Sequence, residues 1–365
     1  MNTAENYKSG KKCLIFFRSK KINDFNGVNE ILSGCASRGY YFEKVLCASY
    51  DDSREITFAL KDAVENYSDA VIYCPKVMEK TLKNFISGVR GGEFSELNIY
   101  NSQDLTAFML FTDNANRLQI EDICAVWNKK YGVHYEKAYI KTVGAPSAVI
   151  KSAVSKIKTA CESIDVNVSE SFGDCKIELV YNGSTPKTLF DKALRGAVEV
   201  LNGYVYALDD ITLEERLFQL LKLRRMKISV AESFTGGGIS KRLVGVSGIS
   251  EVYFEGLNTY SNEAKISRLN VNVDTLRIFG AVSKETAAQM AEGLISTGNC
   301  DVAVSTTGIA GPKSDNTKKP VGLLYIAVAD GAQTQVYEYN LNGTRKSITQ
   351  TAINLALFAV FKKLK

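Results

Sequence analysis

The sequence predicts a multi-domain α/β protein, and three observations lead to that prediction. Its 365 residues are enough for two or three domains at roughly 150 residues each. Short apolar strand patterns alternate with helical patterns, which is typical of parallel sheets. In the last third of the chain, turns rich in Gly, Ser and Thr follow strands, and open α/β sheets bind ligands at such turns. We expect three units, at residues 1–134, 135–211 and 212–365.

The first unit shows architecture but no cluster of catalytic residue types. Apolar strand patterns at 12–17, 41–47 and 70–74 alternate with helical patterns at about 23–39 and 52–66. This alternation predicts an α/β sheet of the parallel type. Further helix and strand candidates lie at 82–89, 107–111 and 120–127.

The middle unit is typical of a small α+β module. A strand at 138–143 leads into a helix at 147–164. A strand pair with an Asn182-Gly183 turn then precedes a helix at 185–201. This order is similar to that of nucleic-acid-binding KH units, but the G-x-x-G loop with which those units clamp a nucleic-acid backbone is absent. Nucleic-acid binding is therefore not favoured.

The third unit begins with a helix at 213–223 and is organised around the stretch from Lys227 to Lys265. Ile228 and Val230 predict a short strand that ends in a polar turn containing Ser233. The strand therefore delivers a serine to its carboxyl end.

The turn after this strand predicts an anion site. Thr235 is a candidate N-cap for the following helix, and Gly236 to Gly238 let a ligand approach backbone N–H groups closely. The helix dipole favours negative charge at that end. We expect an oxyanion or a phosphate there.

A second strand, Tyr253 to Tyr260, leads into a helix capped by Ser261 or Asn262, with Lys265 in its first turn. A lysine in the first turn opposes the helix dipole. It is therefore either an ordinary surface lysine or a lysine whose pKa is lowered for use as a base.

The rest of the third unit continues the α/β pattern. Ser283 caps a long Ala-rich helix that Gly298 ends, and a buried strand at 301–305 runs into the turn Thr307–Pro312. The last strands and the closing helix are expected at 323–328, 335–340 and 347–361.

Composition excludes several classes of protein. No apolar run approaches the roughly 18 residues of a membrane-spanning helix, and the amino terminus lacks a signal-peptide core, so we expect a cytoplasmic protein without membrane contact. The eight cysteines form no C-x-x-C pair, which argues against a zinc site or a disulfide framework. A net charge of +5 gives no strong case for nucleic acid.

The single histidine, His134, restricts the chemistry. Any serine hydrolase built from this chain must use a lysine or a carboxylate as its base, unless His134 itself serves. The G-x-S-x-G, phosphate-loop and H-E-x-x-H motifs are absent. Taken singly, each of four residues has an ordinary structural explanation. Ser233 would be a helix-capping serine and Thr307 a turn residue, while Lys265 would be a surface lysine and Tyr260 a core tyrosine. The residue pattern alone leaves these alternatives open.

A family resemblance adds to this reading. Five segments carry it: Ala231–Gly237, Tyr260–Lys265, Gly280–Ser283, Thr307–Pro312 and Lys319–Gly322. In order and spacing they resemble the carboxy-terminal domain of the competence/damage-inducible CinA family, which is similar to nicotinamide-nucleotide amidase. That activity hydrolyses the carboxamide of nicotinamide mononucleotide to the acid and ammonia. The resemblance implies an amidohydrolase that uses neither metal nor cofactor and forms a homodimer.

The resemblance also implies roles for individual residues. Ser233 becomes the nucleophile, Lys265 the base that takes its proton, and Tyr260 the residue that positions or relays that proton. The base must be neutral to act, so burial or a neighbouring cation should lower its pKa.

The substrate is expected on both sides of this dyad. We hypothesise that the N–H groups of Gly236 and Gly237 hold the oxyanion or the phosphate, with Thr307 and Gly308 at the other wall. Arg345 is a candidate phosphate ligand. The full expected substrate-binding set is Thr235, Gly236, Gly237, Thr307, Gly308, Gly311 and Arg345.

The first unit resembles, more faintly, the molybdopterin-binding-like domain that is associated with ADP-ribose pyrophosphatase activity in full-length family members. Asn29 to Asp52 fits its first helix and strand. Where the family has a glycine-rich turn followed by two aspartates, this chain reads Tyr73-Cys-Pro-Lys-Val-Met78. We therefore expect a catalytically inactive domain kept for assembly.

The favoured function is thus hydrolysis of nicotinamide mononucleotide by Ser233 and Lys265. The alternative is a non-catalytic nucleotide-binding or assembly protein. A third possibility, single-stranded nucleic-acid binding linked to DNA uptake, depends on the family name and the middle module alone.

Overall fold

The computed structural model describes residues 10–19, 25–112, 118–314 and 318–365. They divide into two compact units. The first comprises Met1–Lys137, Ser163–Asp165 and Leu179–Lys187, and the second comprises the remaining residues to Lys365. The boundaries at 134/135 and 211/212 stay a prediction, since this division groups most of the middle module with the carboxy-terminal elements.

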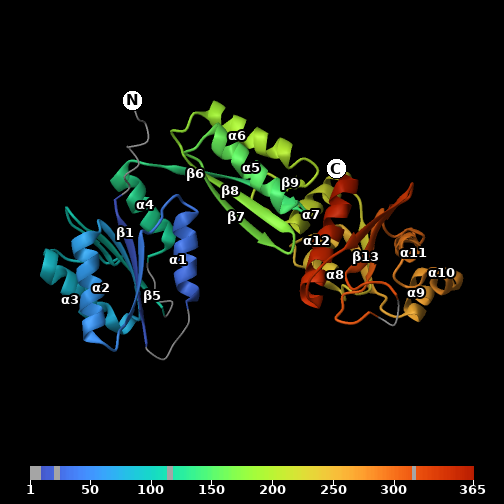
Figure 1. Ribbon diagram of the computed structural model, residues 1–365, viewed down its shortest axis with the longest axis horizontal. Helices are drawn as coiled ribbons and strands as arrows, with labels where there is room; N and C mark the ends of the chain where they lie inside the picture. The colour runs from blue at the N-terminus through green and yellow to red at the C-terminus, as the bar shows by residue number, and fades with distance from the viewer. Residues whose placement is uncertain (1–9, 20–24, 113–117, 315–317) are drawn as a thin grey trace. The chain divides into compact units, whose positions relative to one another are not determined.

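The first unit contains a five-stranded sheet in the order β2-β1-β3-β5-β4, drawn in blue and cyan in Figure 1. Four strands are parallel and β4 pairs antiparallel with β5. The central strands are buried along almost their whole length, as parallel strands covered on both faces must be. The elements are β1 (Lys12–Arg18), α1 (Asn26–Ala36), β2 (Lys44–Ser49), α2 (Ser53–Asn66), β3 (Asp69–Cys74), η1 (Lys76–Met78), α3 (Glu79–Arg90), β4 (Ile99–Asn101), β5 (Thr106–Phe111) and α4 (Ile120–Tyr131).

A buried charge cluster ties α4 to the sheet of this unit. The Asp69 carboxylate is fully buried and accepts hydrogen bonds from Trp127 Nε1 at 2.9 Å and Lys130 Nζ at 3.0 Å. Lys12 Nζ lies 3.8 Å from the same carboxylate. Trp127 is the only tryptophan of the chain, so its fluorescence reports on this unit.

The middle module is α+β, as expected. Its sheet has the order β7-β8-β6-β9, and the element order β-α-β-β-α-β is the split β-α-β arrangement. In Figure 1 α5 and α6 lie on the same face of this sheet. No observation here tests its relation to KH units. The elements are β6 (Tyr135–Val143), α5 (Ser147–Ala160), β7 (Asp165–Ser171), β8 (Asp174–Asn182), α6 (Lys187–Val200) and β9 (Val205–Ala207).

The carboxy-terminal elements form a mixed sheet in the order β11-β10-β12-β13-β14. β10 is parallel to β11 and β12, whereas β13 is antiparallel to both its neighbours. The elements are α7 (Leu213–Arg224), β10 (Ile228–Glu232), α8 (Gly238–Val244), η2 (Ile249–Glu251), β11 (Tyr253–Asn258), α9 (Asn262–Leu269), α10 (Val273–Phe279), α11 (Lys284–Ile295), β12 (Val302–Gly308), β13 (Leu323–Asp330), β14 (Thr334–Asn340) and α12 (Arg345–Leu364).

Two hydrophobic clusters cover the two faces of this sheet. One joins α7 and α12 to side chains such as Val230 and Val304, and the other joins α9 and α11 to side chains such as Ala231 and Ala303. Successive residues of a strand point to opposite faces, so both faces of β10 and β12 are buried. The site can therefore form at the ends of these strands but not on their faces.

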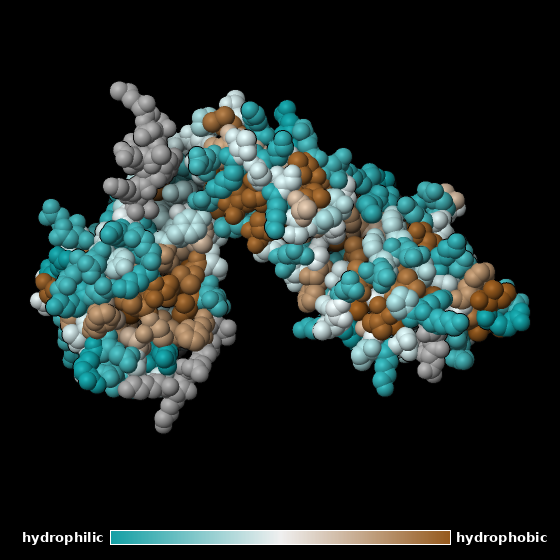
Figure 2. Space-filling view, viewed as in Figure 1, coloured by the Kyte–Doolittle hydropathy of each residue, from teal (hydrophilic) through white to brown (hydrophobic). Residues whose placement is uncertain are grey.

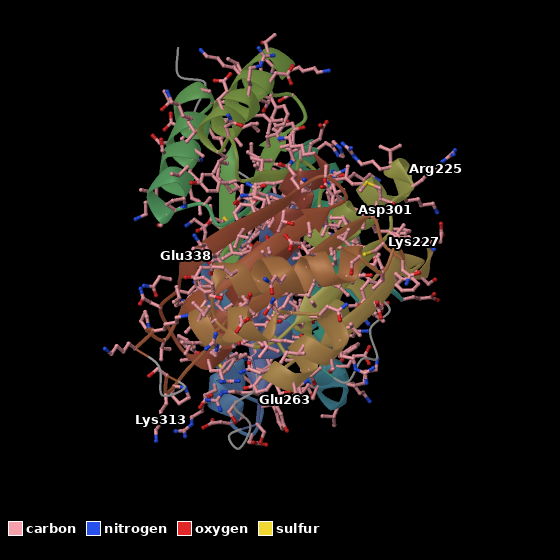
Figure 3. The ribbon with its side chains drawn as sticks, turned by 90° about the vertical axis from the view of Figure 1, so that its right-hand side faces the viewer. Arg225, Lys227, Glu263, Asp301, Lys313 and Glu338 are labelled. Atoms are coloured by element: carbon pink, nitrogen blue, oxygen red, sulfur yellow. The ribbon has the colours of Figure 1, made fainter. Side chains whose placement is uncertain are left out.

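Figure 3 shows the two ends of this sheet. Lys227 and Asp301 mark the amino ends of β10 and β12, where the Lys227 N–H donates to Asp301 Oδ2 at 2.7 Å. Glu263, in the first turn of α9, lies away from them, toward the opposite end. Figure 2 shows hydrophobic residues over α10, where Val273, Ile278 and Phe279 are exposed. Among the described residues, none of the helices is both long and apolar enough to cross a bilayer.

Candidate active site

Ser233 lies at the carboxyl end of β10, between two parallel strands. In the sheet register the preceding residue, Glu232, is opposite Asn258 of β11 and Thr306 of β12. The side chain of Ser233 is buried, with 7 % of its surface exposed. The predicted delivery of a serine to the end of a strand is thus confirmed.

Lys265 reaches Ser233 from α9. Ser261 is the N-cap of this helix, because its hydroxyl accepts from the Ala264 N–H, and this places Lys265 in the first turn as predicted. The Lys265 side chain is 1 % exposed, and its Nζ lies 3.2 Å from Ser233 Oγ. The sequence separates these residues by more than thirty positions, and the parallel strands bring them together.

Burial shifts the Lys265 amine toward its neutral form. Burial lowers the pKa of its amine from 10.5 to about 8. Nζ also donates to the carbonyl oxygens of Thr259, at 2.8 Å, and Tyr260, at 3.1 Å. A neutral amine has two N–H donors and one lone pair. When the two donors are held by carbonyls, the lone pair is left for the hydroxyl proton of Ser233.

Tyr260 contributes its backbone to this arrangement. Its carbonyl oxygen is one of the two acceptors that orient Lys265, whereas the residue as a whole is 64 % exposed. The expected positioning role therefore has a geometric basis in the main chain. A proton relay through the phenol stays a prediction.

Glu232 occupies the amino terminus of α8, where the sequence predicts an external anion. Its buried carboxylate accepts from the backbone N–H groups of Ile239, at 3.1 Å, and Ser240, at 2.9 Å, and from the Ser240 hydroxyl at 2.7 Å. The dipole of a helix favours negative charge at this end. The anion of this helix is therefore a side chain of the protein itself.

One expectation about this turn is wrong. Thr235 is not the N-cap of α8, because the helix begins at Gly238 after Gly237 and the buried Thr235 hydroxyl instead bonds to Thr306 Oγ1 at 2.8 Å. The Gly236 N–H donates to the Ser233 carbonyl at 3.1 Å, and its contact with an anion stays a prediction. Both glycines are left-handed, with φ of 61° and 89°, a backbone conformation that favours glycine.

Thr307 and Lys319 hold the loop that precedes α11. Thr307 Oγ1 donates to the Ala281 carbonyl at 2.7 Å, and Lys319 Nζ donates to the carbonyls of Phe279, at 2.7 Å, and Val282. Three of the five family-like segments are thus joined by hydrogen bonds. In the described residues Thr307 supports the wall of the site by holding this loop.

Lys319→Met is expected to lower the free energy of unfolding of the carboxy-terminal elements by about 2 kcal/mol, since it removes a charged donor shared by two carbonyls. The measurement is urea unfolding followed by circular dichroism. The matched control is Lys318→Met, because the neighbouring Lys318 is exposed. Equal stability of the two variants would contradict this role for Lys319.

The remaining expected residues lie near the ends of β12 and α12. Gly308 has no room for a side chain, because a Cβ there would meet Leu324 Cβ at 2.6 Å and the Phe234 ring at 3.0 Å. Arg345 is exposed, and its Nη1 donates to the Gly311 carbonyl at 2.8 Å. Arg345 therefore supports the Gly311 turn, and its contact with a phosphate stays a prediction.

Sequence reasoning missed three residues of the site. Glu232, Thr259 and Thr306 each act on a predicted residue through a hydrogen bond. The acid directly before Ser233 is the one signal that the sequence offers for these residues. Among the described residues, no group of three or more His, Cys, Asp or Glu side chains is arranged to hold a metal ion.

Comparisons with known proteins match the carboxy-terminal part of the chain. The family model of the CinA C-terminal domain matches residues 210–364. A putative competence-damage inducible protein of Caldicellulosiruptor saccharolyticus is 43 % identical over 49 % of this chain and 43 % of its own length. A CinA-like protein of Kosmotoga olearia is 43 % identical over 46 % of this chain and 40 % of its own length. The chain thus spans less than half the length of these relatives.

A solved structure is also similar. The competence/damage inducible protein CihA from Agrobacterium tumefaciens is 36 % identical, with a TM-score of 0.40 over 41 % of this chain and 92 % of its own. The family match contains Ser233, Lys265 and the segments that surround them. Residues 210–364 thus match the family of CinA C-terminal domains.

Proposed function

We propose that the carboxy-terminal domain is an amidohydrolase that converts nicotinamide mononucleotide to nicotinate mononucleotide and ammonia. The observation that carries the proposal is the 3.2 Å approach of Lys265 Nζ to Ser233 Oγ, with both side chains buried. A lysine whose pKa is about 8 is a competent base near neutral pH, and the chain offers a single histidine for that task.

The mechanism follows from these groups. Ser233 Oγ attacks the carboxamide carbon while its proton passes to Lys265 Nζ, and a tetrahedral oxyanion forms. Collapse of this intermediate breaks the C–N bond, and Lys265 returns the proton to the leaving ammonia. Water then attacks the acyl-serine ester with Lys265 again as base. Nicotinate mononucleotide leaves and the serine hydroxyl is restored.

Substrate contacts are proposed on the two sides of the dyad. Gly237 is the candidate oxyanion donor, because the Gly236 N–H and the first N–H groups of α8 already have acceptors within the protein. Thr307, Gly308 and Gly311 shape the opposite wall. Arg345 is the candidate ligand for the substrate phosphate.

The direct test is to incubate the purified chain with nicotinamide mononucleotide, without added metal, and to measure ammonia. Ser233→Ala is the control for contaminating amidases and should release none. The competing function, a non-catalytic nucleotide-binding protein, is favoured if the native chain binds the nucleotide in calorimetry and releases no ammonia at any pH where Lys265 is neutral.

The pH profile is a second prediction. Because the base is active when neutral, kcat/KM is expected to rise with pH and to level off above the pKa of Lys265, at about 8. The measurement is initial ammonia release across the range from mildly acidic to mildly alkaline pH. A profile that falls over this range would argue against a lysine base.

For the first unit we propose the absence of ADP-ribose pyrophosphatase activity. The proposal is supported by the segment after β3, where Pro75 leads into the short helix η1 instead of a glycine-rich turn. Metal-dependent cleavage of ADP-ribose that is lost on removal of this unit would overturn it. A homodimer likewise stays a proposal, which light scattering of the purified chain decides.

A further inference from the structure

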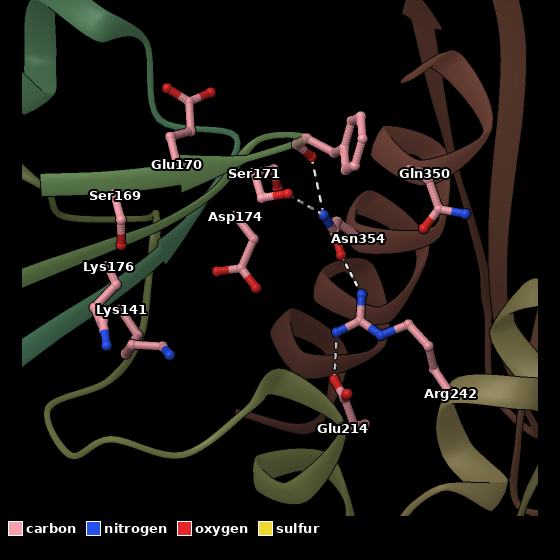
Figure 4. A pocket seen from close by; sticks show the side chains of 11 residues that line it. Lys141, Ser169, Glu170, Ser171, Asp174, Lys176, Glu214, Arg242, Gln350 and Asn354 are labelled. Carbon is pink, nitrogen blue, oxygen red and sulfur yellow. Dashed lines mark hydrogen bonds and ion pairs between the residues drawn. The ribbon is translucent and has the colours of Figure 1, made fainter. Parts of the chain in front are cut away.

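A cavity of about 480 Å³ lies in the second unit, and its lining includes neither Ser233 nor Lys265. Its floor is formed by β6 and β8 of the middle module, and its wall by α7, α8 and α12, as Figure 4 shows. Volumes of 300 to 1,000 Å³ are typical of small-molecule sites, roughly the range of this cavity.

The wall is held by hydrogen bonds between its own residues. Asn354 is 5 % exposed, and its Nδ2 donates to the Phe172 carbonyl at 2.9 Å. Its Oδ1 accepts from Arg242, which also pairs with Glu214. The dashed lines of Figure 4 trace this chain of contacts from the β7–β8 turn to α7. The positive charge of Arg242 is thus matched by Glu214 within the wall.

Two lysines lie together on one side of the floor, and Glu170 is an acid of the cavity lining in addition to Asp174 and Glu214. Lys141 Nζ and Lys176 Nζ lie 3.5 and 3.8 Å from the two oxygens of a single carboxylate, Asp210. The Lys141 side chain is 12 % exposed. Two ammonium groups that share one carboxylate at these distances can accept a further anion, such as the carboxylate of a ligand.

A carboxylate faces the lysines from the centre of the floor. In Figure 4 the Asp174 side chain points into the space between the two lysines and Arg242. Among the described residues its hydrogen-bond donor is Tyr206 Oη, at a long 3.3 Å. Burial raises the pKa of the Asp174 carboxyl, which shows that its partners do not fully replace water. A ligand ammonium at this position would donate the hydrogen bonds that water no longer supplies to the Asp174 carboxylate.

We propose that this cavity binds a small zwitterion of the free amino acid class, with its carboxylate on Lys141 and Lys176 and its ammonium on Asp174. The amide of Gln350, on the α12 wall, is then available to a polar side chain of the ligand. Charges of both signs in one cavity match a zwitterion better than a simple anion, which Asp174 would repel. The proposal does not depend on amidase activity.

The test is binding to the full-length chain. Each common L-amino acid is added singly at millimolar concentration, and the melting temperature and calorimetric heat are measured. At least one is expected to bind, and its N-acetyl and carboxamide derivatives, which each lack one charge, are expected not to bind. Binding of these derivatives with equal affinity, or no binding by any amino acid, overturns the proposal. The cavity would then hold only water.

Variants locate the site. Asp174→Asn, which keeps an acceptor for Tyr206, and Lys141→Gln are each expected to weaken binding by about tenfold or more, since each removes a charge-assisted contact. Lys151→Gln, at an exposed position of α5 outside the cavity lining, is the matched control. Ser233→Ala should bind as the native chain does, which separates this site from the proposed active site. Unchanged affinity in the first two variants would place the ligand elsewhere.

Discussion

Lys265→Met is expected to lower kcat/KM for nicotinamide mononucleotide by a factor of roughly 10³ with the fold retained. Methionine keeps the apolar stem that packs in the buried site but removes the amine that takes the Ser233 proton. The loss should fall on kcat, because the amine acts in the reaction more than in ground-state binding. The measurement is ammonia release at saturating and at low substrate concentration.

Arg268→Met is the matched control for this variant, because Arg268 lies on the same helix, α9, with an exposed side chain. Its kcat/KM should stay near that of the native chain. Circular dichroism and melting temperature establish that both variants are folded. A Lys265→Met protein that keeps kcat/KM within tenfold of the native value would remove Lys265 from the mechanism, even if Ser233 were still required.

Glu232→Ala is expected to lower the free energy of unfolding of the second unit by about 3 kcal/mol. The substitution leaves two backbone N–H groups and the Ser240 hydroxyl without their acceptor and removes the charge that complements the α8 dipole. Glu232→Gln keeps one acceptor oxygen, so its loss should be intermediate. Urea unfolding by circular dichroism measures the change.

The chain offers an internal control for this experiment. Trp127 lies in the first unit, so the midpoint of its fluorescence change should not move in Glu232→Ala. Amide hydrogen exchange should accelerate in α8, where the contacts are lost, more than in α11. Glu292→Ala, at an exposed position of α11, controls for loss of a carboxylate in general. Unaltered exchange in α8 would show that its amino terminus does not need Glu232.

The fold was predictable where hydrophobic periodicity is strong. Strands such as 70–74 and 301–305 are short buried runs, and the structure places β3 and β12 at nearly the same residues. The three-residue strands β4 and β9 were not predicted, because so few residues carry no periodic signal and sheet pairing stabilises them.

The sequence predicts the reacting groups of the candidate site but not the groups that orient them. Ser233 and Lys265 stand out through local turn and helix signals together with the family resemblance. The Thr259 carbonyl that orients Lys265 and the Glu232 carboxylate that caps α8 act through tertiary contacts, which no local pattern shows. The N-cap position predicted for Thr235 is wrong for a related reason. A capping propensity cannot reveal that the Glu232 carboxylate already accepts from backbone N–H groups at the start of α8.

The burial of Lys265 links proton release to folding. Its amine has a pKa of about 8 in the folded protein against 10.5 as a free side chain, so the unfolded chain binds more protons between these pH values. Stability contributed by this group should therefore rise with pH from about 8 to 10.5, by about 3 kcal/mol in total. Buried phenols and thiols, whose pKa values are raised, oppose this rise at its alkaline end. Under the proposed mechanism, loss of the lysine proton would both activate the base and stabilise the fold, whereas activity and stability are more often traded against each other.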